Sequence, residues 1–401
     1  MTYPLPTATE THNIPRDVLA AVCSALGRDT GPVALHEPEF RGSELAYVSD
    51  CIESGWVSSV GKYVDRFEAD LASYTGVKRA VAVVNGTAAL HIALKLVGVE
   101  PGDEVLIPSL TFIATANAVT YAGAVPHFVD SEPCSMGVDA NALEQHLQRI
   151  AIVEVGVCRN RETGARIKAL MPMHVFGHPL DVDAVYALCE RWHLEFVEDA
   201  AESLGSTYKG RHAGSFGRVA GLSFNGNKLV TTGGGGAILT NDEELGRRAK
   251  HLTTTAKLPH KWSFVHDEVG YNYRMPNINA ALGCAQLERL PDMLDRKRQL
   301  AQRYLAAFSG VEGAAILPTP PGTSSNYWLI AMTLNEPDVE LRDQVLQLLN
   351  DNGFMARPVW TLLHKLPMFR NCPKAHLAVA ENLEARIISL PSSPMLADEP
   401  C

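Results

Sequence analysis

Short apolar runs alternate with longer amphipathic or apolar segments from about residue 80 onward. The short runs are rich in Val and Ile without polar alternation, which predicts strands covered on both faces: "RAVAVVN", "DEVLIPS", "AVPHFVD", "AIVEVGV", "IKALMPMHVFG", "LEFVEDA" and "VAGLSF". The segments between them predict helices: "GTAALHIALKLVG", "TFIATANAVTYAGA", "DANALEQHLQRI" and "DVDAVYALCERWH". Strands that alternate with helices are typical of βαβ units, so we predict an α/β fold with a mostly parallel sheet.

The pattern changes after residue 275. A long helical pattern runs from about Pro276 to Phe308, and we expect a break near Pro291 because proline lacks a backbone donor. The loop "LPTPPGTSS" then precedes a strand, "YWLIAMTL", and a helix, "DVELRDQVLQLLNDNGF". We therefore predict three parts: an N-terminal helix or arm (1–34), a large domain (35–274) and a smaller C-terminal α/β domain (275–401).

Composition and charge argue against several kinds of partner. The chain has 401 residues, a net charge of −10 and no Lys/Arg run, so we expect no nucleic acid. No apolar run approaches ~18 residues, and "MTYPLPTATETHNIP" lacks the pattern of a signal peptide. The eight cysteines are scattered without a C-x-x-C pair, which favours reduced thiols. We expect a cytoplasmic protein with no membrane segment.

The nearest approach to a metal-binding pair is His174 and His178 in "HVFGHP". At helical spacing they could share one face, but Gly177 and Pro179 disfavour a helix there. We therefore predict no metal site.

Ligands of open α/β sheets collect at the carboxyl ends of the strands, so the residues that follow each strand are candidates for a site. Asn85, Gly86, Thr87 and Ala88 follow the first strand and open a helix, where backbone N–H groups and the helix dipole attract an anion. A plain N-cap by Asn85 or Thr87 explains the same residues. Phe112 follows the second strand and either stacks on a flat ring or belongs to the core.

Three carboxylates, Glu198, Asp199 and Glu202, follow the strand "LEFVEDA". Charges at the end of a buried strand are costly unless they are paired or functional, although one of them could cap the next helix. Further along, "SFNGNKLVTTGGGG" places Lys228 between two glycine-rich turns. Its resemblance to a nucleotide-binding loop fails, because Asn227 and Leu229 stand where Lys and Ser/Thr are required.

Pyridoxal phosphate fits the order of these candidates along the chain: a site for a phosphate, an aromatic residue that stacks on a ring, a carboxylate at a strand end, and a lysine. The aldehyde of this cofactor forms a Schiff base with a lysine, and a carboxylate keeps its pyridine nitrogen protonated. Lys228 is therefore predicted to bind the cofactor covalently.

The sequence resembles the DegT/DnrJ/EryC1/StrS family of sugar aminotransferases, of fold type I among pyridoxal phosphate enzymes. The resemblance runs from about residue 35 to 394 and is carried by "GWVSSVGKYVDRFE", "NGTAALHIAL", "PSLTFIATANAV", "VEDAAESLG", "SFNGNKLVTTGGGG" and "GYNYRMPNINAALG". The nearest subgroup is that of the legionaminic acid and bacillosamine pathways. The resemblance implies a mostly parallel seven-stranded sheet in the large domain.

The resemblance also implies roles for individual residues. Lys228 carries the cofactor, Asp199 holds the pyridine nitrogen and Phe112 covers the ring. The phosphate is held by Gly86, Thr87, Ala88 and Ser223. Asn272 in "GYNYR" reaches the phosphate in the neighbouring subunit, which implies a homodimer with shared sites. Glu202 stands where many relatives have Gln near the ring hydroxyl, and Asn225 where many have His.

The resemblance further implies that the enzyme moves the amine of glutamate to the C4 ketone of a nucleotide-linked 4-keto-6-deoxy sugar. The subgroup favours a 2-acetamido sugar, for amino-sugar, nonulosonic acid or surface glycan synthesis. The candidates for the substrate walls are "GWVSSVG" with Trp56, Arg274, and the stretch "RPVWTLLHKLP" with His364. Surface or interface packing explains Trp56, Arg274 and His364 equally well.

Three other functions are open. One is amino transfer to a 3-keto-sugar, and another is a non-enzymatic regulator on the same scaffold, which would not need Lys228 and Asp199 together. The third is dehydration at a sugar carbon. The relatives that catalyse this reaction have a histidine in place of the lysine, so Lys228 argues against it.

Overall fold

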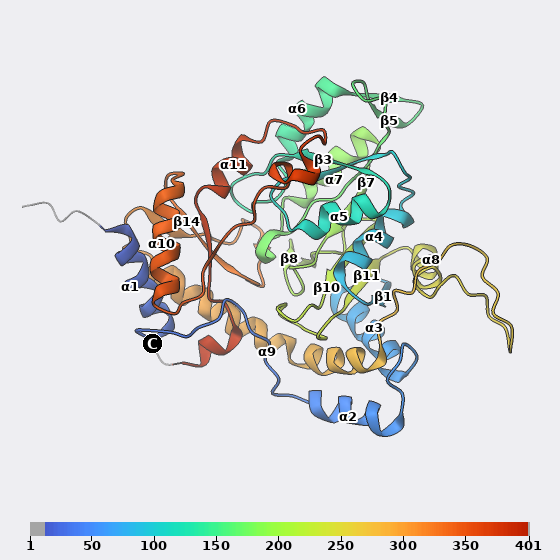
Figure 1. Cartoon of the computed structure of the whole chain (residues 1–401), viewed down its shortest axis with the longest axis horizontal. Coiled ribbons are helices and arrows are strands. Elements are labelled where there is room, and N and C mark those ends of the chain that lie inside the picture. The colour runs from blue at the N-terminus through green and yellow to red at the C-terminus, as the bar shows by residue number, and fades with distance from the viewer. Residues whose placement is uncertain (1–12, 400–401) are drawn as a thin grey trace, which may run out of the picture.

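The large sheet has seven strands and forms the centre of the molecule in a computed structural model that describes residues 13–399 (Figure 1). Most of the N-terminal stretch examined for a signal peptide, residues 1–12, lies outside the described residues. Along the sheet the strands are β1 (Arg79–Val83), β11 (Gly236–Thr240), β10 (Val219–Ser223), β7 (Glu195–Asp199), β6 (Ile167–Leu170), β2 (Glu104–Pro108) and β3 (Val125–Val129). In this sheet β11 is antiparallel to both of its neighbours, β1 and β10, and all the other neighbouring pairs of strands are parallel. The predicted mostly parallel, seven-stranded sheet is confirmed.

Side-chain alternation along the strands builds a core on each face of the sheet. In β1, Val81 and Val83 face a cluster that includes α4 (Gly86–Leu96), α5 (Ile113–Tyr121) and α8 (Glu243–Thr253). Ala80 and Ala82 face the opposite cluster, which includes α3 (Lys62–Thr75). Because both faces are covered, the strands carry apolar residues at nearly every position, as the sequence pattern indicates.

The membership of the sheet differs from the prediction in two places. The segment "AIVEVGV" forms a separate hairpin of β4 (Ala151–Glu154) and β5 (Val157–Asn160), because Val155 (φ 50°) and Gly156 (φ 73°) make a tight turn. The seventh strand is β11, which no predicted segment covered because it emerges directly from the glycine run. The segment "IKALMPMHVFG" is a strand only over β6 and ends in a 3-10 turn at Val175–Gly177.

The predicted helices between the strands are confirmed as α4, α5, α6 (Ala140–Ile150) and α7 (Val182–Trp192). The first of these begins where Asn85 accepts a hydrogen bond from the Ala88 N–H at 2.8 Å. Asp139 and Asp181 cap α6 and α7 in the same way. Capping by short polar side chains therefore fixes the points at which strands turn into helices.

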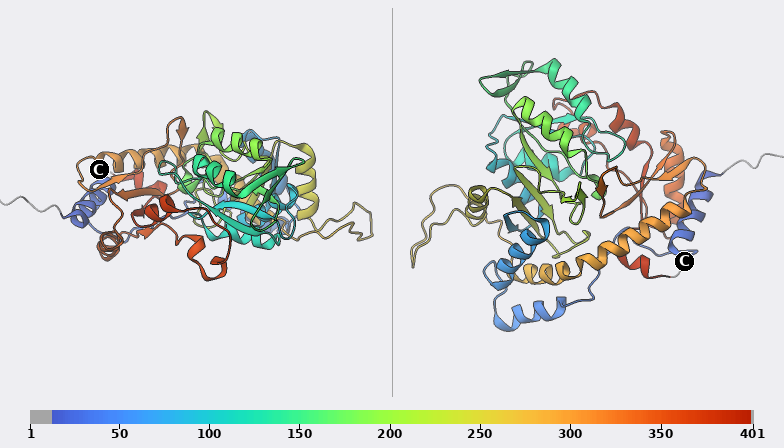
Figure 2. Two further views of the ribbon diagram at one scale, coloured as in Figure 1. Left: turned by 90° about the horizontal axis from the view of Figure 1, so that it is seen from above. Right: turned by 180° about the vertical axis from the view of Figure 1, so that it is seen from behind.

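The helix α9 (Asn277–Ala307) runs unbroken through Pro291, contrary to the predicted break. Proline removes one hydrogen bond, but buried residues on both sides of it, Leu290 and Met293, pack in one core, and the helix continues. Its first half contributes Leu287 and Leu290 to the core of the large sheet. Its second half contributes Leu300 and Tyr304 to a separate C-terminal core. Figure 2 shows α9 as the long helix that links these two regions.

The C-terminal core is built on a four-stranded antiparallel sheet. Its order is β12 (Ala314–Ile316), β14 (Ile330–Leu334), β16 (Ile387–Leu390) and β15 (Arg357–Pro358). The remaining elements are α1 (Ile14–Leu26), α2 (Glu44–Ser54), α10 (Val339–Asp351), α11 (Ala378–Glu384), and the short strands β8 (Thr207–Tyr208), β9 (Arg211–His212) and β13 (Thr323–Ser324). Both α1 and α10 pack in the C-terminal core. The predicted domain boundaries stay a prediction.

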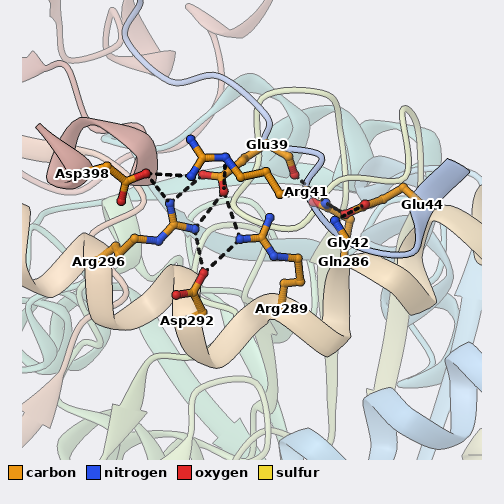
Figure 3. A network of polar contacts seen from close by, with 9 residues as sticks. All are labelled: Glu39, Arg41, Gly42, Glu44, Gln286, Arg289, Asp292, Arg296 and Asp398. Atoms are coloured by element: carbon orange, nitrogen blue, oxygen red, sulfur yellow. Dashed lines mark hydrogen bonds and ion pairs between the residues drawn. The ribbon is translucent and has the colours of Figure 1, made fainter.

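The segment that enters α2 is tied to α9 by a buried charge network (Figure 3). The Glu39 carboxylate accepts hydrogen bonds from Arg296 at 2.8 and 2.9 Å and from Arg289 at 3.0 Å. Arg296 also donates to Asp292 at 2.8 Å, and Arg41 pairs with Asp398 at 2.7 Å. This network holds the chain next to residues 34–36, which line the functional cavity described below.

Replacing Glu39 by alanine is expected to cost about 3 kcal/mol of unfolding free energy, because the buried Arg296 and the partly buried Arg289 lose their shared carboxylate. Denaturant unfolding measures this loss. Glu100→Ala is the matched control, since Glu100 pairs with Arg166 at 3.6 Å on the exposed surface. A loss no larger than that of the control would contradict the structural role of Glu39.

Within residues 13–399, no helix is both long and apolar enough to span a membrane.

Candidate active site

A cavity of about 700 Å³ opens where the strands β7 and β10 end and the helix α4 begins. Seven residues predicted for the site lie on its wall: Gly86, Thr87, Phe112, Asp199, Glu202, Ser223 and Lys228. They come from four separate strand ends or loops. The rule that ligands collect at the carboxyl ends of parallel strands therefore locates this cavity correctly.

Asp199 ends β7 and is almost completely buried, with 2% of its surface exposed. Its carboxylate accepts hydrogen bonds from the Thr115 hydroxyl at 2.7 Å and from the Ala201 N–H at 3.2 Å. Burial raises the pKa of Asp199, and these hydrogen bonds and the charge of Lys228 partly oppose that rise. A carboxylate fixed in this way at the floor of a cavity is suited to pair with a cation.

The neighbouring Glu198 points the other way, as successive residues of a strand do. Its carboxylate accepts backbone hydrogen bonds from Gly214, Phe216 and Gly217, and one from the His174 ring at 3.1 Å. Burial alone would raise the pKa of Glu198, but these partners lower it below its ordinary value. Glu198 and His174 therefore anchor a loop. His178, the other histidine of the predicted pair, makes a T-shaped ring contact with Tyr327, with 5.5 Å between the ring centroids.

The amine of Lys228 lies between a carboxylate and an aromatic ring. Its Nζ donates to Glu202 Oε1 at 3.2 Å and lies 3.7 Å from the centroid of the Trp328 ring. The second oxygen of Glu202 accepts the Phe176 N–H at 2.9 Å. Burial raises the pKa of Glu202 to about 7, against the opposing charge of Lys228.

At the other end of the cavity, the first turn of α4 approaches Ser223 closely. A Cβ added at Gly86 would lie 2.8 Å from the Ser223 Cβ, so only glycine allows this approach. Gly86 and Thr87 present the N-terminal end of a helix to the cavity, which suits an anion. The Ala88 N–H donates to the Asn85 side chain, so Asn85 is an N-cap, and a phosphate contact by Ala88 stays a prediction.

Phe112 belongs to the cavity wall and not to the core. Its side chain is 47% exposed, and its ring lies 6.2 Å from that of Trp360. A flat ring could therefore lie against it.

Five predicted residues do not line the cavity of their own chain: Ala88, described above, and Trp56, Asn272, Arg274 and His364. Trp56 is exposed on the surface, and the Asn272 side chain accepts hydrogen bonds from Arg274. His364 is buried, with its Nδ1 2.7 Å from the Ser109 hydroxyl. The stretch "RPVWTLLHKLP" still contributes to the wall, through Arg357, Pro358 and Trp360.

Several residues of the wall were not predicted from the sequence. They include His36, Met173, Phe176, Trp328 and Met355. Most are apolar or aromatic residues of segments that reach the cavity only through tertiary packing. Trp328 in "NYWLI" is only a weak sequence signal for a cavity wall, since an aromatic residue beside a strand more often belongs to the core.

Comparison with known proteins agrees with this geometry. The model of the DegT/DnrJ/EryC1/StrS aminotransferase family matches residues 38–401. GDP-perosamine synthase of Escherichia coli O157:H7 is 36% identical over 92% of this chain and 95% of its own. The dTDP-4-dehydro-2,3,6-trideoxy-D-glucose 4-aminotransferase of Saccharopolyspora spinosa is 32% identical over 91% and 93%.

A solved structure shares both the fold and the cofactor. The PLP form of a Streptococcus pneumoniae protein superposes with a TM-score of 0.81 at 26% identity, covering 90% of this chain and 93% of that chain. The chain belongs to the DegT/DnrJ/EryC1/StrS aminotransferase family. It is an aminotransferase that depends on pyridoxal phosphate.

The residues of the cavity fit this cofactor. Four kinds of group surround one space: a lysine amine, a buried carboxylate, an exposed aromatic ring, and a helix N-terminus that a glycine brings close to Ser223. When bound, pyridoxal phosphate supplies an aldehyde that reacts with amines and a ring that withdraws electrons.

Proposed function

We propose that this enzyme transfers the amine of glutamate to the C4 ketone of a nucleotide-linked 4-keto-6-deoxy sugar. The observation that carries the proposal is that Lys228 and the buried Asp199 open onto one cavity whose walls come from many segments. A 2-acetamido sugar is the favoured acceptor, on the strength of the motif resemblance to the legionaminic acid and bacillosamine subgroup.

In this proposal each residue of the cavity has a distinct task. Lys228 binds the cofactor and, when free, moves a proton between the carbon of the substrate and that of the cofactor. Asp199 keeps a proton on the ring nitrogen, and Phe112 covers the ring. Gly86, Thr87 and Ser223 receive the phosphate. Glu202 lies next to the lysine, where its carboxyl group also reaches toward the ring hydroxyl.

Two observations favour a nucleotide sugar as the acceptor. The names of two relatives state that they act in GDP-perosamine synthesis and on a dTDP-linked 4-dehydro sugar. In addition, the cavity is large enough for a bulky substrate. Arg357 on its wall suits either a phosphate of the nucleotide or the carboxylate of glutamate. We infer that Arg357 contacts the acidic part of one of the two substrates.

The decisive experiment separates the two halves of the reaction. The enzyme is loaded with glutamate, freed of 2-oxoglutarate, and mixed with individual keto-sugars while the cofactor spectrum is recorded. Return to the aldehyde form with nucleotide-linked 4-keto-sugars supports the proposal. Comparing the rates with 2-acetamido and plain sugars, and with UDP-linked and GDP-linked sugars, then identifies the preferred acceptor. Return only with 3-keto-sugars would replace it by the alternative enzyme. Return only with free keto acids would refute a sugar acceptor.

We also propose a homodimer with shared sites. Residues 257–269 form an arm that projects from the body of the molecule (Figure 2). Its apolar side chains are unusually exposed, with Trp262 at 77%, Phe264 at 78% and Val269 at 83%. Large exposed apolar side chains favour an interface, and a second copy is the partner that the motif resemblance implies. Asn272 follows this arm directly, outside the cavity of its own chain.

Mixing Asn272→Ala with Lys228→Ala chains is expected to restore activity. Half of the dimers formed at random are mixed, and each holds one site with both native residues, so about a quarter of the wild-type activity should return. Steady-state turnover after subunit exchange measures it. As a control, the double variant mixed with Asn272→Ala should regain nothing. A fully active monomer on a sizing column would contradict the shared site.

A further inference from the structure

Trp328 is held in place from three directions. Its backbone N–H donates to Asn326 Oδ1 at 2.8 Å, and its indole Nε1 donates to the Asn227 carbonyl at 2.8 Å. Its own carbonyl accepts a hydrogen bond from the buried Lys297 at 2.9 Å. Only 6% of the residue is exposed. The backbone of Trp328 is therefore anchored, and the indole can swing away from the cavity only by giving up its own hydrogen bond to the Asn227 carbonyl.

The face of this fixed ring is directed at the reactive amine. Lys228 Nζ lies 3.7 Å from the ring centroid, within the range of a cation–π contact. On its other side the amine donates to Glu202, whose side chain is 1% exposed and is oriented by the Phe176 N–H. Two buried groups that attract an ammonium thus meet at one nitrogen atom.

Both contacts depend on a lysine amine that is free. An ammonium has three N–H donors and a compact charge, and joining its nitrogen to another group removes donors that these contacts use. Glu202 would otherwise be a buried carboxyl group without a cationic partner, which is costly. The other charged or titratable groups near the amine are Asp199 and His36, which line the same cavity.

We propose that Trp328 and Glu202 form a holding site for the amine of Lys228 during the part of the reaction in which this lysine is not bonded to the cofactor. Trp328 is a positioning residue in this proposal, because it acts through the lysine. The proposal rests on the proposed covalent role of Lys228. By stabilising the free lysine, the holding site favours the amine form of the cofactor over the aldehyde form.

The first test is an equilibrium measurement on the holoenzyme. The ratio of amine to aldehyde form is read from the cofactor spectrum in fixed mixtures of glutamate and 2-oxoglutarate. Because this equilibrium compares the two free enzyme forms, contacts to substrate cancel. Trp328→Leu is expected to lower the ratio about fivefold, the effect of one partly desolvated cation–π contact. Trp328→Phe keeps an aromatic face and should recover most of the ratio.

The matched control is Trp360→Leu. Trp360 lines the same cavity but packs against Phe112 and Phe176, at 6.2 and 5.0 Å between ring centroids. It should leave the ratio unchanged. An unchanged ratio in Trp328→Leu, or an equal loss in both leucine variants, would overturn the holding site.

The second test needs no cofactor. In the cofactor-free protein, Lys228 is modified with an amine-reactive reagent at fixed pH, and its peptide is followed by mass spectrometry. Trp328→Leu should be modified several-fold faster than wild type, and Trp360→Leu at the wild-type rate. Equal rates in all three would overturn the proposal. If glutamate converts the cofactor in none of the proteins while this labelling difference persists, glutamate fails as the proposed amino donor and the contact between Trp328 and the lysine amine stands.

Discussion

Replacing Lys228 by alanine is expected to abolish amino transfer while the fold survives. The side chain lies on the cavity wall, and within residues 13–399 its amine has two close partners, the Glu202 carboxylate and the Trp328 ring. Losing both the covalent anchor and the group that moves the proton should cost at least about 10⁴-fold in turnover. Circular dichroism and thermal unfolding check the fold, and steady-state turnover checks the loss.

A second substitution separates the two possible roles of this lysine. Lys228→Arg keeps a positive charge but has no amine that can bond to an aldehyde, so it should be as inactive as Lys228→Ala. In the wild-type protein, borohydride reduction should fix the cofactor to the peptide that contains Lys228. Substantial turnover by Lys228→Arg would mean that the residue serves as a point charge. Lys209→Ala, on the exposed surface, is the control for loss of a lysine.

The large sheet is predictable because burial on both faces leaves a simple pattern of apolar runs between helices. The pattern fails where local turn chemistry decides. Val155 and Gly156 fold "AIVEVGV" into a hairpin, although its composition suits a central strand. The strand β11 is missed because it begins at the last of four glycines and pairs antiparallel, without the helix that separates the other strands. Burial likewise outweighs the proline in α9.

The chemistry at the strand ends is also predictable, because one geometric rule brings Asp199, Ser223 and Lys228 to the same edge. The aromatic wall is not. Trp328 and Trp360 come from the C-terminal part of the chain, and only tertiary packing turns their side chains toward Lys228 and Phe112. The residue pattern alone does not distinguish Glu198 from Asp199, and only the family resemblance selects Asp199. In the structure, strand alternation sends Glu198 to a loop and Asp199 to the cavity.

The substitution of Asp199 by asparagine is expected to slow the chemistry severely without disturbing the fold. Asparagine has nearly the same shape but only one acceptor oxygen, so it keeps one of the two hydrogen bonds that the Thr115 hydroxyl and the Ala201 N–H donate to separate oxygens of Asp199 at 2.7 and 3.2 Å. What it lacks is the charge that keeps a proton on the ring nitrogen. Removing a preorganised charge from a buried site should raise the barrier by several kcal/mol, or about 10³-fold in rate.

Single-turnover reaction with glutamate measures this barrier without interference from the acceptor sugar. Thr115→Val is the matched control, because it removes one hydrogen bond to Asp199 and leaves the carboxylate, so its rate should fall far less. A rate for Asp199→Asn close to wild type would transfer the role to another carboxylate. The structure leaves Glu202 for that role, since the oxygens of Glu198 are bonded to the backbone of residues 214–217 and to His174. Slow turnover in Asp199→Asn with a normal rate in Glu202→Gln would then assign the ring nitrogen to Asp199 alone.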